Sequence, residues 1–247
     1  MAPTVYLISG ANRGIGLGLV QQLAARENVV VFAGVRNPSA AKDLQALEVS
    51  HPGKIYTVKL TSVNKEDNEA AVQKIKTVAG RLDVVIANAG VGDSYAPSDK
   101  VPLDDMRSHY EVNVLGPLVL FQAAWPLLKA SQTPKFIVVS SLAGSIEVAT
   151  KLPMPIMAYG VSKAAVNWLA AKLWYEYPEL ISLPVHPGSV RTDMAKNGLA
   201  KLPEAFGQIS MITIEEGAKG VLSVIDAAKR DEAGPTFLSY DGTVLPW

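Results

Sequence analysis

The sequence contains no cysteine and no excess of either charge. Without a thiol, disulfide bonds and thiolate chemistry are excluded. Its 23 basic and 23 acidic side chains balance, so there is no electrostatic reason to expect nucleic acid or an anionic membrane as a partner. The N-terminal residues lack a basic leader with an apolar core, and no apolar run looks long enough to span a bilayer. We therefore expect a cytoplasmic protein that binds neither nucleic acid nor a membrane.

The chain does contain a regular alternation of strand-like and helical segments. Its 247 residues suit one α/β domain. Short runs rich in branched apolar residues predict strands at 5–8, 29–35, 55–60, 82–87, 135–139, 181–185 and 236–240. Helical patterns cover 17–26, 38–49, 65–79, 103–129, 158–173 and 214–229. This alternation predicts a doubly wound parallel sheet of about seven strands with helices on both faces.

A glycine-rich turn follows the first predicted strand. Gly10, Gly14 and Gly16 have the spacing that lets a backbone turn tightly, approach a pyrophosphate and pack a helix against a strand. The free N–H groups at the start of the next helix would face the phosphates. Three glycines also occur in ordinary turns, but their position between a first strand and a helix favours nucleotide binding.

The second predicted strand ends in a cation where many nucleotide sites have a carboxylate. Val35 is followed by Arg36, and Arg13 in the glycine turn is a second cation. A carboxylate here would bind the free ribose hydroxyls of NADH, whereas arginine suits a 2′-phosphate. The pair therefore indicates NADPH. The alternative is that both arginines are solvated surface residues.

Tyr159 and Lys163 lie four residues apart in a segment rich in helix-forming residues. On a helix, this spacing places both side chains on one face, roughly 6 Å apart along the axis. A neighbouring cation lowers the pKa of a phenol from its usual value of about 10, and a phenol with a lowered pKa can exchange a proton near neutral pH. Taken alone, the pair could equally be a coincidence on a surface helix.

Further polar residues stand at strand ends and inside an apolar helix. Asn88-Ala89-Gly90 follows the fourth predicted strand, and Ser141, which could bind a carbonyl oxygen, follows the fifth. Asn113 interrupts an apolar helical segment, where its amide must find partners; it could bend the helix and hold a water. A turn serine and a structural asparagine are the alternatives.

Together these motifs resemble the short-chain dehydrogenase/reductase superfamily over essentially the whole chain. The residues that carry the resemblance are Gly10-x3-Gly14-x-Gly16, Asn88-Ala89-Gly90, Asn113, Ser141, Tyr159-x3-Lys163 and Pro187-Gly188. Segments 158–163 and 240–247 are similar to sniffer-type carbonyl reductases and to norsolorinic-acid ketoreductase. The resemblance implies a single Rossmann-fold domain over residues 1–247.

The resemblance also implies a role for each site residue. Tyr159 is the proton donor to the carbonyl oxygen, and Lys163 lowers its pKa and holds the nicotinamide ribose. Ser141 orients the carbonyl, and Asn113 keeps a water of a proton relay. No metal is expected. The residues implied to bind NADPH are Gly10, Asn12, Arg13, Gly14, Ile15, Gly16, Arg36, Thr61, Asn88, Ala89, Gly90, Tyr159, Lys163, Pro187, Gly188, Val190 and Thr192.

The chain departs from the family pattern at several places. Ser9 stands where threonine is usual, and Thr61 stands where an aspartate commonly contacts adenine. Ser141 and Tyr159 are further apart than usual because of an extra loop at 145–156. We expect this loop, and a mostly apolar flap at about 193–213 that includes Phe206, to shape the substrate pocket.

These observations predict an NADPH-dependent reductase of a ketone or aldehyde. A bulky, apolar or aromatic carbonyl compound is the expected small-molecule substrate, with polyketides among the candidates. Two alternatives are open: a catalytically inactive, NADP-binding regulator on the same fold, and an alcohol dehydrogenase that works in the oxidising direction. Trp168 and Trp174 on the Tyr159 helix suggest either a homodimer or tetramer, or a role in the core.

Overall fold

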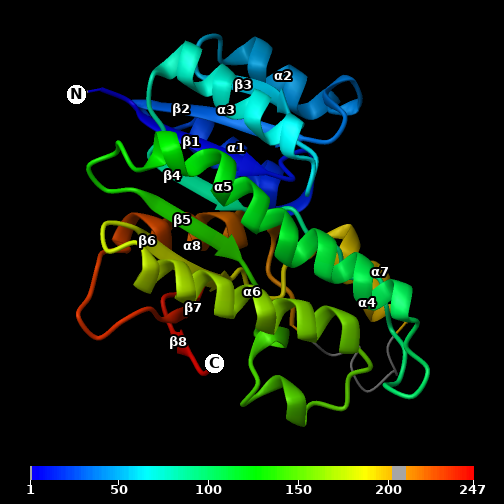
Figure 1. Ribbon diagram of the computed structural model, residues 1–247. Coiled ribbons are helices and arrows are strands. Elements are labelled where there is room, and N and C mark those ends of the chain that lie inside the picture. Colours follow the sequence, from blue (N-terminus) through cyan, green and yellow to red (C-terminus); the bar gives the residue numbers. More distant parts are fainter. Residues whose placement is uncertain (1, 202–209) are drawn as a thin grey trace.

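The computed structural model describes residues 2–201 and 210–247, which contain one sheet of eight strands (Figure 1). The strand order is β3-β2-β1-β4-β5-β6-β7-β8, and only the β7–β8 pair is antiparallel. The strands are β1 Thr4–Ser9, β2 Val29–Val35, β3 Ile55–Lys59, β4 Val84–Ala87, β5 Lys135–Val139, β6 Ile181–His186, β7 Phe237–Ser239 and β8 Val244–Leu245. The predicted fold class is confirmed, with one strand more than expected because the chain turns back at Gly242, whose φ is 86°.

Helices cover both faces of this sheet (Figure 1). One face carries α1 Gly14–Ala24, α2 Lys42–Ser50 and α8 Ile214–Ala227. The other carries α3 Lys65–Ala79, α5 Gly116–Leu128 and α6 Met157–Glu176, with α4 Leu103–Tyr110 continuing into α5. Short 3₁₀ turns lie at Pro38–Ala40, Leu142–Gly144 and Ala149–Lys151.

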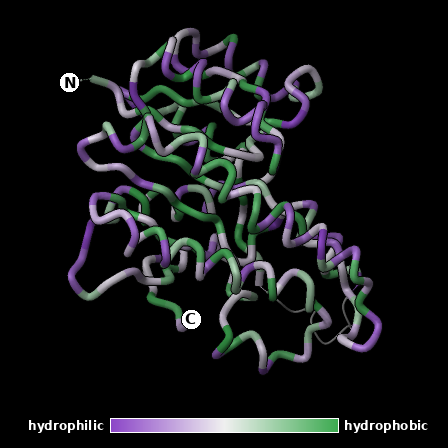
Figure 2. Tube along the Cα trace, viewed as in Figure 1, coloured by the Kyte–Doolittle hydropathy of each residue, from purple (hydrophilic) through white to green (hydrophobic). Residues whose placement is uncertain are grey.

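The strands are apolar on both sides because helices bury both faces. In β1, Tyr6 and Ile8 belong to the core under α1, α2 and α8, whereas Val5 and Leu7 belong to the core under α3, α5 and α6. Figure 2 shows this arrangement as hydrophobic strands inside and hydrophilic residues on the outer turns of the helices. The two cores fix the sheet, so that the loops at its carboxyl edge are held in place.

The segment predicted as one helix at 103–129 is continuous but changes its winding. Between α4 and α5 the chain makes a π-helical turn at Glu111–Leu115, and Asn113 lies inside this turn. Such turns insert an extra residue into a helix and are frequent at functional sites. By length and composition Leu103–Leu128 could cross a membrane, contrary to our expectation, but 44% of its apolar window is buried. It packs against α3 and α6, as a core helix does.

The described part of the predicted flap begins with a short helix. α7 Asp193–Leu199 starts at Thr192, whose hydroxyl accepts a hydrogen bond from the Ala195 N–H at 3.3 Å. After the flap, Ile212 forms a parallel bridge with Val190. The predicted flap residues Leu202, Phe206 and Ile209 lie outside the described residues.

Candidate active site

The carboxyl ends of β1, β4 and β5 bring the predicted motifs to one edge of the sheet. β1 pairs with β2 on one side and β4 on the other, so the direction in which strands are added reverses there. Ligands of open α/β sheets bind in the crevice at such a switch point. The glycine turn follows β1, Asn88–Gly90 follows β4, and Ser141 follows β5.

The glycine turn is shaped for close backbone approach. Gly10 and Gly14 adopt left-handed backbone conformations, with φ of 65° and 54°. A methyl group on Gly16 would overlap the Gly10 carbonyl oxygen and lie 2.6 Å from the Asn88 side-chain nitrogen, so only glycine fits there. Ile15, between these glycines, is partly buried against the core.

The start of α1 is open to an anion. Arg13 is the N-cap residue, no side chain caps the first turn, and that turn contains no acidic residue. Its N–H groups and the positive end of the helix dipole are therefore available to a phosphate. Together with the glycine turn, this arrangement fits the pyrophosphate of a dinucleotide.

Ser9 and Asn88 join the ends of β1 and β4. The Ser9 hydroxyl accepts hydrogen bonds from the N–H groups of Asn88 and Ala89, both at 3.0 Å. The Asn88 amide donates to the carbonyl oxygens of Ser9 and Gly10 at 3.0 and 3.1 Å. Asn88 therefore holds the glycine turn in place, and serine supplies the hydroxyl that the turn needs.

Arg13 and Arg36 are both exposed beside this crevice, as is Asn12. Within the described ranges, the arginines that form ion pairs are Arg26, Arg81 and Arg107. Arg13 and Arg36 are not among them, and their predicted contact with a phosphate stays a prediction. A 2′-phosphate fits this pair, since arginine binds phosphate through its planar fork.

Thr61 is placed after β3 but is already engaged. Its carbonyl oxygen accepts from the Asn68 side chain at 3.0 Å. Its hydroxyl hydrogen-bonds the Asp67 carboxylate and, as the largest influence, lowers the pKa of that group. The predicted contact between Thr61 and the adenine stays a prediction.

Residues after β6 form the wall opposite the glycine turn. Gly188 has a φ of 85°, and Pro187 and Val190 pack against Gly217 of α8. The methyl group of Thr192 faces Gly14. These residues, predicted to touch the cofactor, are therefore brought to the same crevice as the glycine turn.

Tyr159, Lys163 and Ser141 come together where α6 meets the end of β5. The Lys163 ammonium lies 5.6 Å from the centre of the Tyr159 ring and donates to the Val139 carbonyl oxygen at 2.8 Å. Gly144 closes the turn after Ser141 directly against α6, since a methyl group there would lie 2.6 Å from the Lys163 carbonyl carbon. The predicted trio is thus assembled by one close contact between a turn and a helix.

Asn113 is tied to the same place through the π-helical turn. Its amide oxygen accepts from the Val91 N–H at 2.8 Å, and its amide nitrogen donates to the Val91 carbonyl and the Ser162 hydroxyl, both at 2.9 Å. The side chain therefore clamps the segment after β4 to α6. The water that the resemblance assigns to Asn113 stays a prediction.

The ionisation of the pair differs from the sequence prediction. Burial raises the pKa of Tyr159, a hydrogen bond with Ser141 lowers it, and the nearby Tyr95 raises it. Burial also lowers the pKa of Lys163 to about 8. The net shift of the Tyr159 pKa is therefore upward, and the lowering of this pKa by Lys163 stays a prediction. The Lys163 ammonium donates instead to the Val139 carbonyl oxygen, and burial is the largest influence on the Tyr159 pKa.

Comparison with known proteins places the chain in a family. A family model described as short chain dehydrogenase matches residues 4–202. The norsolorinic acid ketoreductase of Emericella nidulans is 36% identical over 250 residues, which cover 99% of this chain and 94% of the relative. The chain belongs to the short-chain dehydrogenase family. The resemblance stated from its motifs is confirmed, and the protein is an oxidoreductase of this family.

Two solved structures share the fold of this short-chain dehydrogenase from end to end. The NADPH-bound carbonyl reductase from chicken fatty liver has a TM-score of 0.87 and 31% identity, with 100% of each chain covered. The carbonyl reductase Sniffer of D. melanogaster has a TM-score of 0.85 and 28% identity, again with 100% of each chain covered.

Gly92 and His186 also belong to the site, although the sequence motifs did not single them out. Gly92 has no side chain, and two neighbours come close to its backbone as a result. A methyl group at this position would lie 3.1 Å from the Tyr159 ring and 3.3 Å from the Met194 sulfur. His186 accepts from the Leu142 N–H through Nδ1 at 3.2 Å and so supports the Ser141 turn. Burial lowers the pKa of His186 to about 4, which keeps it a neutral acceptor. The one sequence feature that pointed to His186 is its position directly before the Pro187-Gly188 motif.

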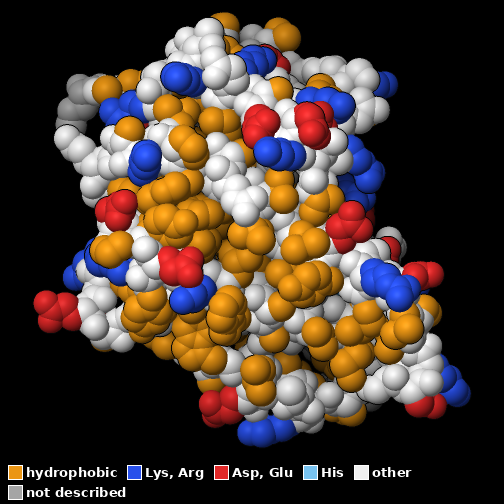
Figure 3. Space-filling model, in the orientation of Figure 1, with side chains coloured by type: hydrophobic (Ala, Val, Ile, Leu, Met, Phe, Trp, Pro, Cys, Tyr) orange, Lys and Arg blue, Asp and Glu red, His pale blue; other side chains and the backbone are white. Residues whose placement is uncertain are grey.

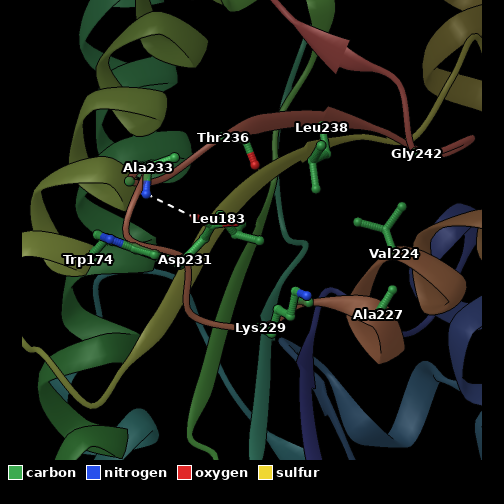
Figure 4. A pocket seen from close by; sticks show the side chains of 12 residues that line it. Trp174, Leu183, Val224, Ala227, Lys229, Asp231, Ala233, Thr236, Leu238 and Gly242 are labelled. Carbon is green, nitrogen blue, oxygen red and sulfur yellow. Dashed lines mark hydrogen bonds between the residues drawn. The ribbon is translucent and has the colours of Figure 1, made fainter.

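Two hollows among the described residues of this short-chain dehydrogenase are not lined by Tyr159. Figure 4 shows one of about 250 Å³, lined by Trp174, Leu183, Val224, Lys229, Asp231, Leu238 and their neighbours near the end of α8. Another, of about 840 Å³, runs along α1 beside the start of α8 and includes Gly14 in its lining. The site is therefore identified by its side chains and not by the size of a cavity.

Proposed function

We propose that this short-chain dehydrogenase is an NADPH-dependent reductase of ketones or aldehydes. The observation that carries the proposal is the junction of Tyr159, Ser141 and Lys163, closed by Asn113 from the π-helical turn. The position of a methyl group on Gly90 lies 3.1 Å from the Asn113 amide oxygen and 3.7 Å from the Lys163 ammonium. The turn after β4 thus sits directly beside the proposed proton donor system.

Tyr159 is placed to give a proton to a carbonyl oxygen. Because burial raises its pKa, the phenol keeps its proton at neutral pH, which suits reduction. Ser141, hydrogen-bonded with Tyr159, would hold the same carbonyl oxygen and stabilise the charge that develops on it. When bound, the reduced nicotinamide supplies the hydride.

Lys163 is proposed to supply a positive charge next to Tyr159. With a pKa of about 8 it is mostly protonated at neutral pH, so it can bind ribose hydroxyls and stabilise the phenolate left after proton transfer. An inactive regulator on this fold would need none of these four side chains. Their presence in one junction therefore supports an enzyme.

NADPH is proposed over NADH because of the two free arginines. Arg36 follows β2, where no carboxylate is present to accept hydrogen bonds from a free 2′-hydroxyl. Arg13 lies in the glycine turn, as the N-cap residue of α1. The chicken carbonyl reductase was solved with NADPH bound, which supports the same choice.

An apolar carbonyl compound is the proposed substrate. The Met194 sulfur lies beside Gly92, as does the Tyr159 ring, and the loop before α6 presents Ile146 and Leu152, which are exposed apolar side chains. Burying such groups against an aromatic or bulky aliphatic ketone is favourable.

The proposal is tested by NADPH consumption with a panel of aryl ketones, diketones and aldehydes. We expect NADPH absorbance to fall with aryl ketones and the product alcohol to form in equal amount. Cofactor binding without turnover on the whole panel would favour the inactive regulator. Turnover confined to alcohols with NADP⁺ would favour the oxidising direction.

A further inference from the structure

Tyr95 is a second tyrosine at the proposed site. It has no role among the four residues proposed for the reaction, which are Asn113, Ser141, Tyr159 and Lys163. It lies in the segment after β4, and its hydroxyl donates to the Gly92 carbonyl oxygen at 2.8 Å. Gly92 is also the residue against which the Tyr159 ring packs. One glycine therefore separates the two phenols, and Tyr95 is near enough to raise the pKa of Tyr159.

The segment that carries Tyr95 is fixed from α4. Ser94 is buried, and its hydroxyl donates to the Asp105 carboxylate at 2.7 Å. The imidazole Nε2 of His109 lies 3.5 Å from the Asp93 carboxylate. Both contacts hold residues next to Tyr95, so the phenol is held in place before a substrate arrives.

The described part of the flap packs its backbone directly against the Tyr95 hydroxyl. Gly198 of α7 faces it, and a methyl group on Gly198 would overlap the phenol oxygen. The Lys201 ammonium lies 5.5 Å from the centre of the Tyr95 ring. The ring is thus covered by a cation, while the oxygen lies beside a residue without a side chain.

The Tyr95 hydroxyl can act towards a substrate only as a hydrogen-bond acceptor, because its own proton is already donated to Gly92. Burial raises the pKa of Tyr95, so the phenol keeps its proton, and that proton is committed to Gly92. A phenol whose proton is committed can still accept a hydrogen bond. A carbonyl substrate bound at Tyr159 would meet this acceptor with whatever group extends toward Gly92.

We infer that Tyr95 is a specificity-determining residue that accepts a hydrogen bond from a hydroxyl group of the substrate, so that the enzyme prefers hydroxylated ketones. The inference rests on the proposed function. A site built to bind a substrate hydroxyl discriminates against analogues that lack it.

The test compares acetophenone with 3-hydroxy-, 4-hydroxy- and 3-methoxyacetophenone, using wild type and Tyr95→Phe. We expect wild type to favour at least one hydroxy compound over its methoxy and plain analogues. Tyr95→Phe should reduce kcat/KM for that compound by roughly tenfold, equal to about 1.4 kcal/mol, and change acetophenone by less than about twofold. The methoxy group keeps the oxygen but cannot donate, so it isolates the hydrogen bond.

Two further variants separate this effect from a general disturbance. Tyr110→Phe removes the hydroxyl of an exposed tyrosine on α4 and should leave all ratios unchanged. Gly198→Ala should push the Tyr95 hydroxyl aside and reproduce the loss. A hydroxy-to-methoxy ratio unaffected by Tyr95→Phe would overturn the inference while leaving the reductase intact. Absence of turnover with every ketone in wild type would instead contradict the proposed function.

Discussion

Lys163 combines a buried ammonium with a pKa near the physiological range. Because burial lowers that pKa from 10.5 to about 8, the charge is present below pH 8 and lost as the pH rises. Between about pH 8 and 10.5 the Lys163 amine is protonated in the unfolded chain but largely neutral in the folded protein. The free-energy cost of burying Lys163 therefore becomes smaller as the pH rises through this range. The consequence for function runs the other way, because the proposed role needs the charge.

We therefore predict that kcat/KM for NADPH falls as the pH rises through about 8, since this ratio reports ionisations of the free enzyme. The measurement is a pH profile from about 6.5 to 9.5 with a saturating ketone. Lys163→Arg keeps its charge over this range, so its profile should lack this decline whatever its remaining activity. A wild-type profile that is flat across pH 8 would contradict the role given to Lys163.

Arg36 tests the choice of cofactor. A charge-assisted hydrogen bond contributes about 1.5 to 3 kcal/mol, with the lower end expected at an exposed site. Two arginines should thus give a preference for NADPH over NADH of roughly 10²-fold. Arg36→Ala should remove most of this preference because it weakens the binding of NADPH. Arg107→Ala, a change on α4, should leave the preference unchanged. Equal catalytic efficiencies with both cofactors in wild type would show the assignment to be wrong.

Residue types and their spacing were enough to predict which side chains meet, but not how they ionise. Tyr159 and Lys163 at four residues apart predicted a shared helix face, and α6 confirms the helix. The direction of the Tyr159 pKa depends first on burial, and then on Ser141 and on the electrostatic influence of Tyr95, none of which a local pattern contains. The positions of Tyr95 and His186 were missed for the same reason.

At the scale of elements, the turn Leu142–Gly144 decides whether Ser141 reaches Tyr159. A methyl group on Gly144 would meet main-chain atoms of Lys163 and Ala164 at 2.6 to 2.9 Å, and these atoms cannot move aside without moving α6. Gly160 lies on the same interface, but there a methyl group would meet only the Ala143 carbonyl oxygen, at 3.2 Å.

We therefore predict that Gly144→Ala lowers kcat by at least about tenfold and destabilises the fold by roughly 1 to 3 kcal/mol, the usual range for overpacking. Gly160→Ala, the matched control, should keep most of its activity. Thermal unfolding and ketone reduction, measured on both variants, provide the check. Equal behaviour of the two variants would mean that the turn–helix contact does not position Ser141.

The π-helical turn could not be predicted from the apolar periodicity of 103–129. Its extra residue is stabilised by the contacts of Asn113 with Val91 and Ser162, which lie on two other elements. β8 escaped prediction because a strand of two residues, Val244–Leu245, is too short to show a pattern. The π-helical turn depends on residues that are distant in the sequence, and β8 is very short, so neither shows a local pattern that predicts it.

At the scale of the whole molecule, one face is unusually apolar. Figure 3 shows hydrophobic side chains gathered over the region of α5 and α6. Trp168 is 68% exposed, and Tyr110, Leu115 and Val161 are also exposed apolar side chains of the α4–α6 helices. Trp174, by contrast, is buried under the Arg230 guanidinium, which lies 4.1 Å from its ring centre. The core alternative therefore holds for Trp174 only.

We predict that this face forms a homodimer or tetramer, because large contiguous apolar patches on monomers usually mark interaction sites. Light scattering at micromolar concentration should give at least twice the monomer mass. Trp168→Glu should shift the protein toward the monomer, whereas Val49→Glu, at an exposed valine of α2, should not. A monomeric mass for wild type would remove the prediction.

The central claim is that Tyr159 donates the proton in ketone reduction. The most direct measurement compares wild type and Tyr159→Phe for turnover of an aryl ketone with NADPH and, separately, for the affinity of NADPH. The account predicts a fall in kcat of roughly 10²-fold or more, the scale of lost general acid catalysis, with NADPH affinity and thermal stability nearly unchanged. Turnover close to wild type in Tyr159→Phe would contradict the account.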